Sequence, residues 1–330
     1  MPLGVPSARA VTPFIFNSLG NIFEPIGSNI QVAIDDLPDE GGMINLPVKE
    51  LTISDKVVVD KPVYIKGSGM TWQGTEGGTC IRTDGGLVDK NMFEFYNASG
   101  RFHFAGMSDL SLINYDGRNG IYVHGVADAH FRRVYINHGA LNCIYIEGSE
   151  FDMWNLWITE CLFENAGQGG VKVDPGDHDI IKTHILDNYF YACELGVCLQ
   201  RDVEPGGKTS AFTIKGNHMY DITKTGIQLW KVADHIDVSD NILHNIGTAT
   251  VNTYNGIRVG DGNVEADKCQ WIKIMGNIIN GNSAAKYGIS LEDYADRVLV
   301  MGNEVHGCAT APYNAEVGVT NVVHEHNIEV

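Results

Sequence analysis

Two short patterns decide the fold: Phe212-Thr213-Ile214-Lys215-Gly216-Asn217 and, soon after it, Gly226-Ile227-Gln228-Leu229. In the first pattern, apolar residues alternate with polar ones up to a terminal asparagine. In the second, a glycine precedes two apolar residues that one polar residue separates. Alternation with a period of two predicts a β-strand with one buried face. The stretch therefore predicts two strands, each with a fixed turn residue at one end.

Both patterns recur along the chain. The glycine position falls at Gly120, Cys143 (a cysteine in the glycine position), Gly170, Gly196, Gly226, Gly256, Gly288 and Gly318. The asparagine that ends the other pattern falls at Asn217, Asn241, Asn277 and Asn303. Strands that repeat at such intervals indicate a solenoid with one turn per repeat, in which asparagines on successive coils can stack. A leucine-rich repeat would need a dense leucine consensus, which is absent. We therefore predict an all-β fold, a single parallel β-helix of about ten coils.

The first residues of the solenoid predict a cap. Residues 29–37 show helical spacing of apolar residues, and Pro38 stops the helix. A short amphipathic helix can cover apolar surface on the first coil, which no neighbouring coil buries. We divide the chain into a lead-in or attachment arm, residues 1–28, and a capped β-helix, residues 29–330. The arm is mostly apolar, and the last coil has no evident cap, so we expect both ends to contact other proteins.

These features resemble the pectate-lyase-like right-handed β-helix superfamily, closest in style to the bacteriophage tailspike proteins. The resemblance rests on the helix, on Gly-Gly-x-Ile-x-Leu-Pro at residues 41–47, and on Gly-x-Gly at 67–69 before Thr-x-Ile at 79–81. One departure is Lys49-Glu50-Leu51, where the family usually has Gly-x-Tyr. The resemblance implies a homotrimer that binds polysaccharide, with virion or assembly proteins at its two ends. The superfamily contains lyases, hydrolases, epimerases and non-catalytic adhesins, so the fold alone does not choose an activity.

The charge and composition exclude several partners. The chain has 330 residues, with 41 acidic and 23 basic residues and a net charge of −18. Such a chain repels phosphate backbones and anionic lipid, so we expect no nucleic-acid or membrane partner. No secretory signal is visible at the start. The seven cysteines are scattered without a Cys-x-x-Cys pair, which indicates thiols formed in a reducing compartment. We expect synthesis in the cytoplasm and a final location on a virion or outside the cell.

Register places the outward residues of the glycine-anchored strands in two columns. The first column contains Tyr122, Tyr145, Lys172, Cys198, Gln228, Arg258 and Ser290, and the second contains His124, Glu147, Asp174, Gln200, Trp230, Gly260 and Glu292. Adjacent coils lie about 4.8 Å apart. Glu147 and Asp174 should therefore be neighbours, with His124 one coil before them and Arg201 just beyond the strand of the following coil.

Two carboxylates at this separation suit a retaining glycosidase, and their proximity raises one pKa so that this group can act as an acid. We predict Glu147 and Asp174 as the acid and base or nucleophile, with His124 and Arg201 assisting. Flat rings and cations in line can bind sugars, so the predicted substrate-binding residues are Tyr122, Tyr145, Lys172, Trp230 and Arg258. The simpler interpretation is that an acidic protein exposes many carboxylates, which form solvated rows on the surface and have no catalytic role.

The turn at residues 174–179 offers a metal alternative. Oxygen ligands from Asp174, Asp177 and Asp179 can hold Ca²⁺, although the same residues suit a polar turn rich in Pro and Gly. The predicted hydrolase requires no cofactor, and calcium is the one ion that we consider.

We therefore predict a glycan-recognising, tailspike-like virion protein that can act as a glycosidase-type depolymerase. One alternative is a calcium-dependent polysaccharide lyase or C5-epimerase on uronates, with Lys172, His124 or His178 as base. Another is a non-catalytic structural or adhesive β-helix. The chain lacks the Arg-x-Pro-x-x-Arg motif of pectate lyases and the polygalacturonase motifs, which disfavours pectin chemistry.

Overall fold

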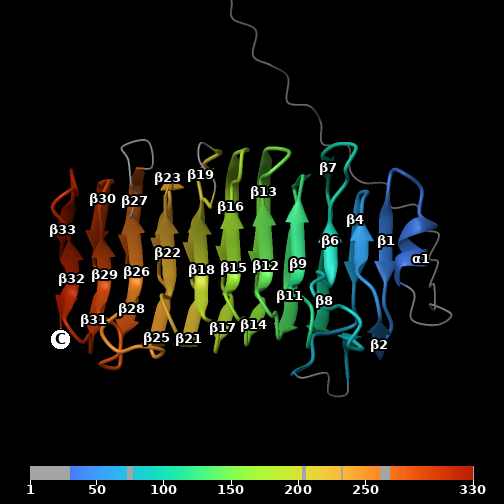
Figure 1. Ribbon diagram of the computed structural model, residues 1–330, viewed down its shortest axis with the longest axis horizontal. Coiled ribbons are helices and arrows are strands. Elements are labelled where there is room, and N and C mark those ends of the chain that lie inside the picture. Colours follow the sequence, from blue (N-terminus) through green and yellow to red (C-terminus); the bar gives the residue numbers. More distant parts are fainter. Residues whose placement is uncertain (1–29, 73–76, 203–205, 232, 261–267, 330) are drawn as a thin grey trace, which may run out of the picture.

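The chain winds into a parallel β-helix in the computed structural model, which describes residues 30–72, 77–202, 206–231, 233–260 and 268–329 (Figure 1). One long sheet has ten parallel strands, one from each coil. Its strands are β3 (Val57–Val59), β6 (Phe93–Phe95), β9 (Asn119–His124), β12 (Asn142–Glu147), β15 (Gly169–Asp174), β18 (Leu195–Gln200), β22 (Ile227–Trp230), β26 (Asn255–Gly260), β29 (Tyr287–Leu291) and β32 (Ala311–Ala315). The predicted solenoid of about ten coils is confirmed.

The other faces of the solenoid form a sheet of 22 strands. They are β1 (Gly42–Asn45), β2 (Lys49–Ile53), β4 (Val63–Lys66), β5 (Thr79–Thr83), β8 (Gly106–Ile113), β11 (His130–Asn137), β13 (Met153–Thr159), β14 (Leu162–Glu164), β16 (Ile180–Leu186), β17 (Tyr189–Tyr191), β19 (Thr209–Ser210), β20 (Thr213–Lys215), β21 (His218–Ile222), β23 (Ala233–Asp234), β24 (Asp237–Ser239), β25 (Ile242–Ile246), β27 (Cys269–Met275), β28 (Ile278–Asn280), β30 (Ala295–Met301), β31 (Glu304–His306), β33 (Val323–Glu325) and β34 (Ile328–Glu329). A further pair consists of β7 (Phe102–His103) and β10 (Val126–Ala127).

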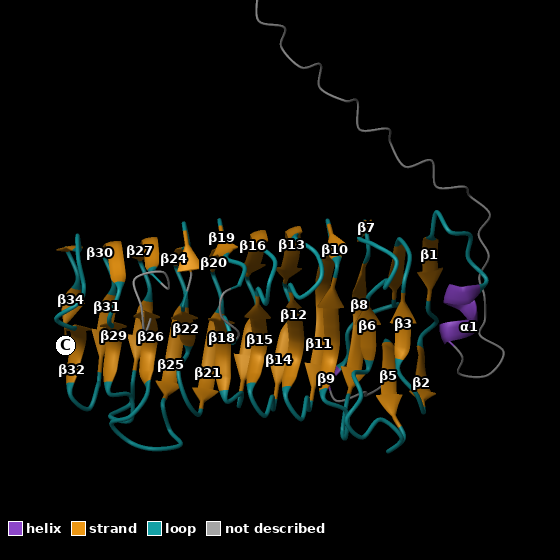
Figure 2. Cartoon of the chain, turned by 45° about the horizontal axis from the view of Figure 1, so that its top comes forward, coloured by secondary structure: helices purple, strands orange, loops and turns teal. Residues whose placement is uncertain are grey.

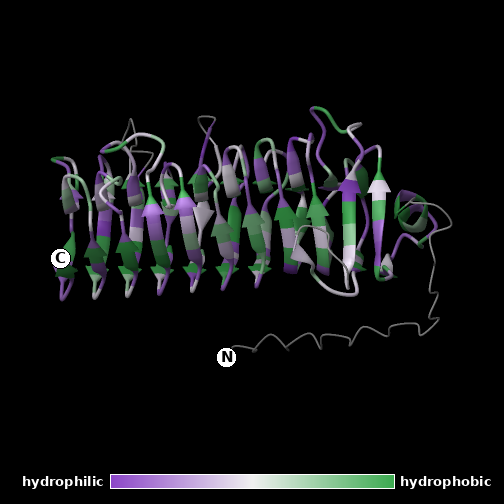
Figure 3. Ribbon diagram, turned by 90° about the horizontal axis from the view of Figure 1, so that it is seen from below, coloured by the Kyte–Doolittle hydropathy of each residue, from purple (hydrophilic) through white to green (hydrophobic). Residues whose placement is uncertain are grey.

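Alternation along each strand fills the solenoid with apolar side chains. In β22, for example, Ile227 and Leu229 are fully buried. Figure 3 shows hydrophobic and hydrophilic bands alternating along the coils. One continuous core therefore runs from the first coil to the last, and the outward positions remain available for function.

Asparagines stack along one turn of the solenoid. The amide side chain of Asn241 donates to the Oδ1 atom of Asn277 at 2.9 Å, and Asn217 donates to Asn241 at the same distance. The ladder runs through Asn188, Asn217, Asn241, Asn277, Asn303 and Asn327. All six residues that precede a ladder asparagine have positive φ, and three of them are glycines, which adopt it without strain: Gly216, Gly276 and Gly302. The predicted stacking is confirmed.

In most repeats the anchor residue is a glycine, which leaves space for the core side chains below it. A Cβ atom on Gly170 would lie 2.4 Å from the ring of the core residue Phe190, and one on Gly288 would lie 2.2 Å from a methyl group of Val305. Larger residues would therefore push the ten-stranded sheet away from the core.

The last repeat differs from the sequence prediction. Register pairs Tyr287 with Ala311 and Ile289 with Tyr313, so that Pro312 lies opposite Gly288. Gly318, the predicted anchor, instead lies in the turn after β32. Leu299 then pairs with Val323. The final coil is therefore shorter than the repeats just before it, whose spacing predicts the anchor at Gly318.

The predicted cap forms as α1 (Ile30–Asp35), at one end of the solenoid (Figure 2). Ile30 and Ile34 are buried, and the Gln31 side chain bonds the backbone of Val58 on β3. This contact covers the first coil as expected. The predicted attachment arm lies outside the described residues.

Candidate functional site

The predicted columns of the ten-stranded sheet lie in the predicted register. His124 pairs with Glu147, and Glu147 pairs with Asp174 on the next coil. Tyr122, Tyr145 and Lys172 align in the other column. The structure therefore brings these predicted catalytic and binding residues together on three successive coils.

Hydrogen bonds fix the first part of this site. The Tyr122 hydroxyl donates to Oε2 of Glu147 and lies 3.2 Å from Nδ1 of His124. The other ring nitrogen of His124 is 3.2 Å from the Ser149 hydroxyl. Burial lowers the pKa of His124, so the imidazole is neutral at neutral pH. Burial and the neighbouring Glu147 raise the pKa of Tyr122, which keeps that phenol protonated.

The strongest electrostatic feature is a pair of carboxyl groups, Asp174 and Asp202. Burial, together with the charge of Asp202 and a hydrogen bond to its carboxyl group, raises the pKa of Asp174 to about 6. Although burial acts in the opposite direction at Asp202, the hydrogen bond and charge of Lys172 hold the pKa of that carboxyl below its usual value. The Lys172 amino group lies 2.8 Å from Asp202. One carboxyl of the pair therefore keeps a proton while the other is ionised.

Asp202 faces a hollow of about 330 Å³, which we call the Lys172 hollow. Its lining residues are Asn142, Gln168, Gly169, Lys172, Glu194, Leu195, Cys198, Gln200, Asp202 and Lys224. Gln200 donates to Asp202 at 2.6 Å. The Cys198 thiol is buried, which raises its pKa to about 12 and makes it a poor nucleophile. The chemistry available in this hollow is that of the carboxyl pair and the lysine.

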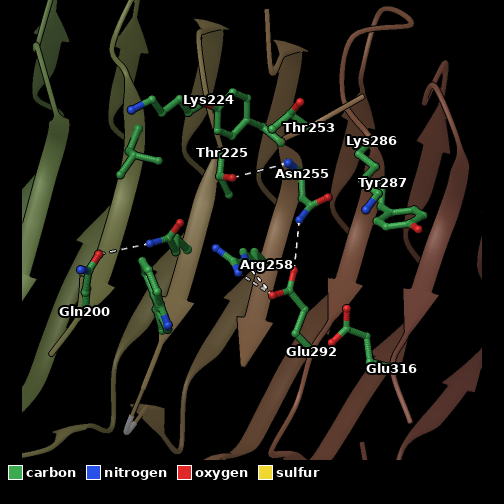
Figure 4. Close-up of a pocket in the computed structure, with 14 residues that line it drawn as sticks. Gln200, Lys224, Thr225, Thr253, Asn255, Arg258, Lys286, Tyr287, Glu292 and Glu316 are labelled. Atoms are coloured by element: carbon green, nitrogen blue, oxygen red, sulfur yellow. Dashed lines mark hydrogen bonds and ion pairs between the residues drawn. The ribbon is translucent and has the colours of Figure 1, made fainter. Parts of the chain in front are cut away.

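A second hollow of about 460 Å³ continues the first, and we call it the Arg258 hollow (Figure 4). It is lined by Leu195, Gln200, Lys224, Thr225, Gln228, Trp230, Thr253, Tyr254, Asn255, Arg258, Lys286, Tyr287, Glu292 and Glu316. Three residues line both hollows: Leu195, Gln200 and Lys224. Together the hollows form a groove along the outward face of the ten-stranded sheet.

Arg258 organises the second hollow. Its Nε and Nη2 atoms donate to Glu292 at 2.8 and 2.6 Å, and its guanidinium carbon lies 5.1 Å from the centre of the Trp230 ring. Burial and the charges of Glu292 and Asp293 raise the pKa of Glu316. Figure 4 shows the Glu292 and Glu316 side chains next to each other on the same side of Arg258. Rings, amides and carboxyl groups on one wall are suited to sugar hydroxyls.

The remaining predicted residues fall in different places. Trp230 and Arg258 line the groove. Arg201 is buried and lines neither hollow, while the next residue, Asp202, faces the groove. The structure does not gather Asp174, Asp177 and Asp179 into a metal site. Within the ranges described, no group of three His, Cys, Asp or Glu residues is placed to hold a metal ion.

Sequence reasoning assigned no role to three groups that the structure places in the groove: Asp202, Glu316 and Lys224. Asp202 lies two residues beyond the outward residue Gln200, so extending the alternation of β18 by two residues would have found it. Glu316 was hidden because the last repeat was anchored at Gly318. Lys224 precedes the strand β22 and belongs to neither column, and its position in both hollows follows from the turn that leads into that strand.

Comparison with known proteins places the chain in a family. A family model described as a right handed beta helix region matches residues 95–329. This match spans well over half of the chain, and the protein therefore belongs to the right-handed β-helix family. No curated protein sequence matches the chain. Among the described residues, no helix has both the length and the apolar content to cross a membrane.

Solved structures share the fold. An alginate lyase from Paenibacillus sp. str. FPU-7 is 12% identical, with 88% of this chain and 95% of that chain covered and a TM-score of 0.60. The C387A mutant of DFA-IIIase from Arthrobacter chlorophenolicus A6 is 14% identical, with 90% and 77% covered and a TM-score of 0.62. ORF18 of Geobacillus virus E2 is 16% identical with a TM-score of 0.43, and this chain, 91% covered, spans 56% of it. At these identities the likeness shows the fold alone.

Proposed function

We propose that the protein binds a polysaccharide along the groove of the ten-stranded sheet and cleaves its glycosidic bonds. The observation that carries this proposal is the Asp174–Asp202 pair, which holds a proton up to about pH 6. Asp202 lines the Lys172 hollow, and the aromatic side chains of the groove line the adjoining Arg258 hollow. A carboxyl group with a raised pKa beside an ionised one is the arrangement that general acid catalysis requires. The fold likeness to an alginate lyase and to a DFA-IIIase is compatible with carbohydrate chemistry on this scaffold.

Each residue then has a role. The carboxyl pair donates a proton to the leaving oxygen, and Lys172 keeps Asp202 ionised. Glu147, on the preceding coil, acts as base or nucleophile, since a separation of about one coil approaches the ~5–5.5 Å of retaining glycosidases. Tyr122 and His124 orient Glu147, while Trp230 and Arg258 bind the polysaccharide further along the groove. Calcium-dependent elimination on uronates is the competing reaction.

The test is a panel of neutral and acidic polysaccharides that includes inulin, xylan, alginate and polygalacturonate. Each is incubated with wild-type protein, Asp174→Asn and Glu147→Gln, and polymer size is followed by size-exclusion chromatography. A polymer that shortens with wild type alone supports the proposal. Unsaturated products, or loss of activity with a chelator, would assign elimination instead. If no polymer shortens, or if the variants cleave equally well, the proposed site is wrong.

The pH dependence of cleavage should follow the carboxyl pair. We expect the rate to fall as the pH rises through about 6, because the pair then loses its proton. Lys172→Gln removes the cation that lowers the pKa of Asp202, so the alkaline limb should move to higher pH. Lys224→Gln is the matched control, since Lys224 pairs with Glu194 and does not contact the pair. A limb that stays unchanged in Lys172→Gln would exclude the pair as the proton donor.

A homotrimer, and assembly proteins bound at the two ends on a virion or outside the cell, stay predictions of the sequence. Light scattering of the purified chain and a search for the protein in purified virions would test them.

A further inference from the structure

A chain of hydrogen bonds across β9 and β12 ends at a serine hydroxyl that the proposed cleavage does not use. The Ser149 hydroxyl lies 3.2 Å from Nε2 of His124, and Nδ1 of the same ring lies 3.2 Å from the Tyr122 hydroxyl. That phenol donates in turn to Oε2 of Glu147. We call these four groups the Ser149 relay. A serine, an imidazole and a carboxylate in this order are the parts of a nucleophilic site.

The direction of each hydrogen bond in the Ser149 relay follows from the phenol. Tyr122 has one hydroxyl hydrogen, which it donates to Glu147, so its oxygen can only accept from His124. Nδ1 of His124 therefore carries the ring proton, and Nε2 presents its lone pair to the Ser149 hydroxyl. Burial lowers the pKa of His124, which keeps this lone pair free of a proton at neutral pH. The imidazole is thus oriented and protonated as a base for Ser149 must be.

Burial separates the base from the group that a substrate can reach. His124 is only 5% exposed, and the Tyr96 ring stacks on it at 4.8 Å between ring centres. Ser149 is half-buried and follows the end of β12, two residues beyond Glu147. Glu147 pairs with Asp174 on the next coil, so the serine lies beside the proposed path of the polysaccharide. A bound chain can therefore meet the hydroxyl while the imidazole stays shielded from water.

The charges around the Ser149 relay limit the kind of ester that it can attack. The carboxylates of Glu147 and Glu150 both act on His124, and Glu150 accepts a hydrogen bond from the Tyr96 hydroxyl at 3.2 Å. Two carboxylates beside the nucleophile repel a phosphate or sulfate ester, which carries its negative charge at the reacting atom. A carboxylic ester of a sugar hydroxyl is neutral and meets no such repulsion.

We propose that Ser149 is the nucleophile of an esterase that removes acyl groups, such as acetyl, from hydroxyls of the bound polysaccharide. The choice of a sugar ester rests on the proposed function, whereas the assignment of the nucleophile rests on the relay alone. The activity is separate from the cleavage of glycosidic bonds, because it breaks a bond between an acyl carbon and a sugar oxygen.

The reaction consumes water and needs no other reactant. The Ser149 oxygen bonds to the carbonyl carbon of the ester, and its proton passes to Nε2 of His124. The bond between that carbon and the sugar oxygen then breaks, and His124 returns the proton to the sugar oxygen. Water next attacks the acyl group on Ser149 and gives one proton to His124. The carboxylic acid leaves, and the proton returns to the serine oxygen. Tyr122 and Glu147 are positioning residues, which hold the imidazole in the required tautomer.

The first test measures ester hydrolysis by wild type, Ser149→Ala and Tyr122→Phe. The probes are p-nitrophenyl acetate and acetylated xylan, and the released p-nitrophenol and acetate are quantified. We expect Ser149→Ala to lower kcat/KM by about a thousandfold or more. Tyr122→Phe disconnects His124 from Glu147 and should lower kcat on p-nitrophenyl acetate by about a hundredfold, with KM nearly unchanged. A merely structural tyrosine would not produce this difference between kcat and KM.

The second test labels the nucleophile directly with an alkyl fluorophosphonate, which bonds to an activated serine and releases fluoride. Peptide mass spectrometry should place the adduct on Ser149 in wild type and find none in Ser149→Ala. The matched control is Ser99→Ala, at an exposed turn serine outside the relay, which should hydrolyse esters and accept the label as wild type does. Circular dichroism checks that every variant folds.

A wild type that hydrolyses neither ester and gains no adduct would overturn the proposal, as would hydrolysis that persists in Ser149→Ala. Polymer size is followed in the same samples. Acetate release without shortening of the polymer would support the esterase and contradict the proposed cleavage, and shortening without ester hydrolysis would do the reverse.

Discussion

Replacing Asp174 by asparagine is expected to lower the rate of polysaccharide cleavage by about two to four orders of magnitude, the usual contribution of a general acid. The amide cannot donate the proton that the Asp174–Asp202 pair holds up to about pH 6. The new side chain would still fill the same space, and its amide oxygen can still accept the backbone hydrogen bond from Gly176 that Asp174 accepts at 3.0 Å. The measurement is the initial rate on the polymer that the panel identifies, as a function of pH.

The same substitution should lower the catalytic rate but raise the stability of the folded chain. Measuring both therefore distinguishes a loss of catalysis from a loss of folding. The pKa of Asp174 is raised from 3.8 to about 6 in the folded chain, so this group lowers stability progressively as the pH rises between these values, and by the full amount above about pH 6. Asp174→Asn should therefore unfold at a higher temperature than wild type at mildly alkaline pH, and at the same temperature in acid. An inactive variant with unchanged or raised stability supports a catalytic role. A variant that keeps its activity would remove Asp174 from the mechanism.

The columns of the groove could be predicted because register in a β-helix follows directly from the repeat. Each coil adds one strand in parallel, so residues at the same offset from the glycine anchor lie side by side. This argument correctly aligned Glu147 with Asp174 and Gln228 with Arg258. It needs only a reliable anchor, and the anchors before the last coil were correct.

The rest depended on what happens after a strand ends. Arg201 and Asp202 follow the end of β18 and were therefore left out of the columns, although the alternation of outward and inward side chains continues through them. Packing buries Arg201 and turns Asp202 to the groove. The final coil is shortened in the same kind of segment, which moved the anchor to Pro312 and hid Glu316. Prediction of the site was therefore limited by the segments that follow the strands, whereas residues inside the strands before the last coil were placed correctly.

The asparagine ladder should be the most sensitive element for stability. Asn241→Leu is expected to lower the free energy of unfolding by on the order of 3–5 kcal/mol. The substitution leaves several buried polar groups without a hydrogen-bond partner, and each such group costs about 1–3 kcal/mol. The Asn241 side chain donates to the carbonyl of Ile214 at 2.9 Å and accepts both the backbone and the amide N–H of Asn217 at 3.0 and 2.9 Å. Leucine has the same number of side-chain heavy atoms and the same branching and is the larger residue, so the substitution leaves no cavity and the loss reports mainly on these hydrogen bonds. Urea denaturation followed by circular dichroism measures it.

Asn327 provides the matched control, because it occupies the same ladder position but is only half-buried. Its amide donates to Val300, and its Oδ1 accepts from Asn303. In Asn327→Leu, water can reach the partners that lose their hydrogen bonds, so the loss should be about 1 kcal/mol or less. If both substitutions lowered the free energy of unfolding equally, burial of the groups that lose their hydrogen bonds would have no effect. That result would contradict the expected role of the buried ladder. A large difference would show that the ladder stabilises the solenoid through desolvated amide hydrogen bonds, which hold successive coils in the register that aligns the groove.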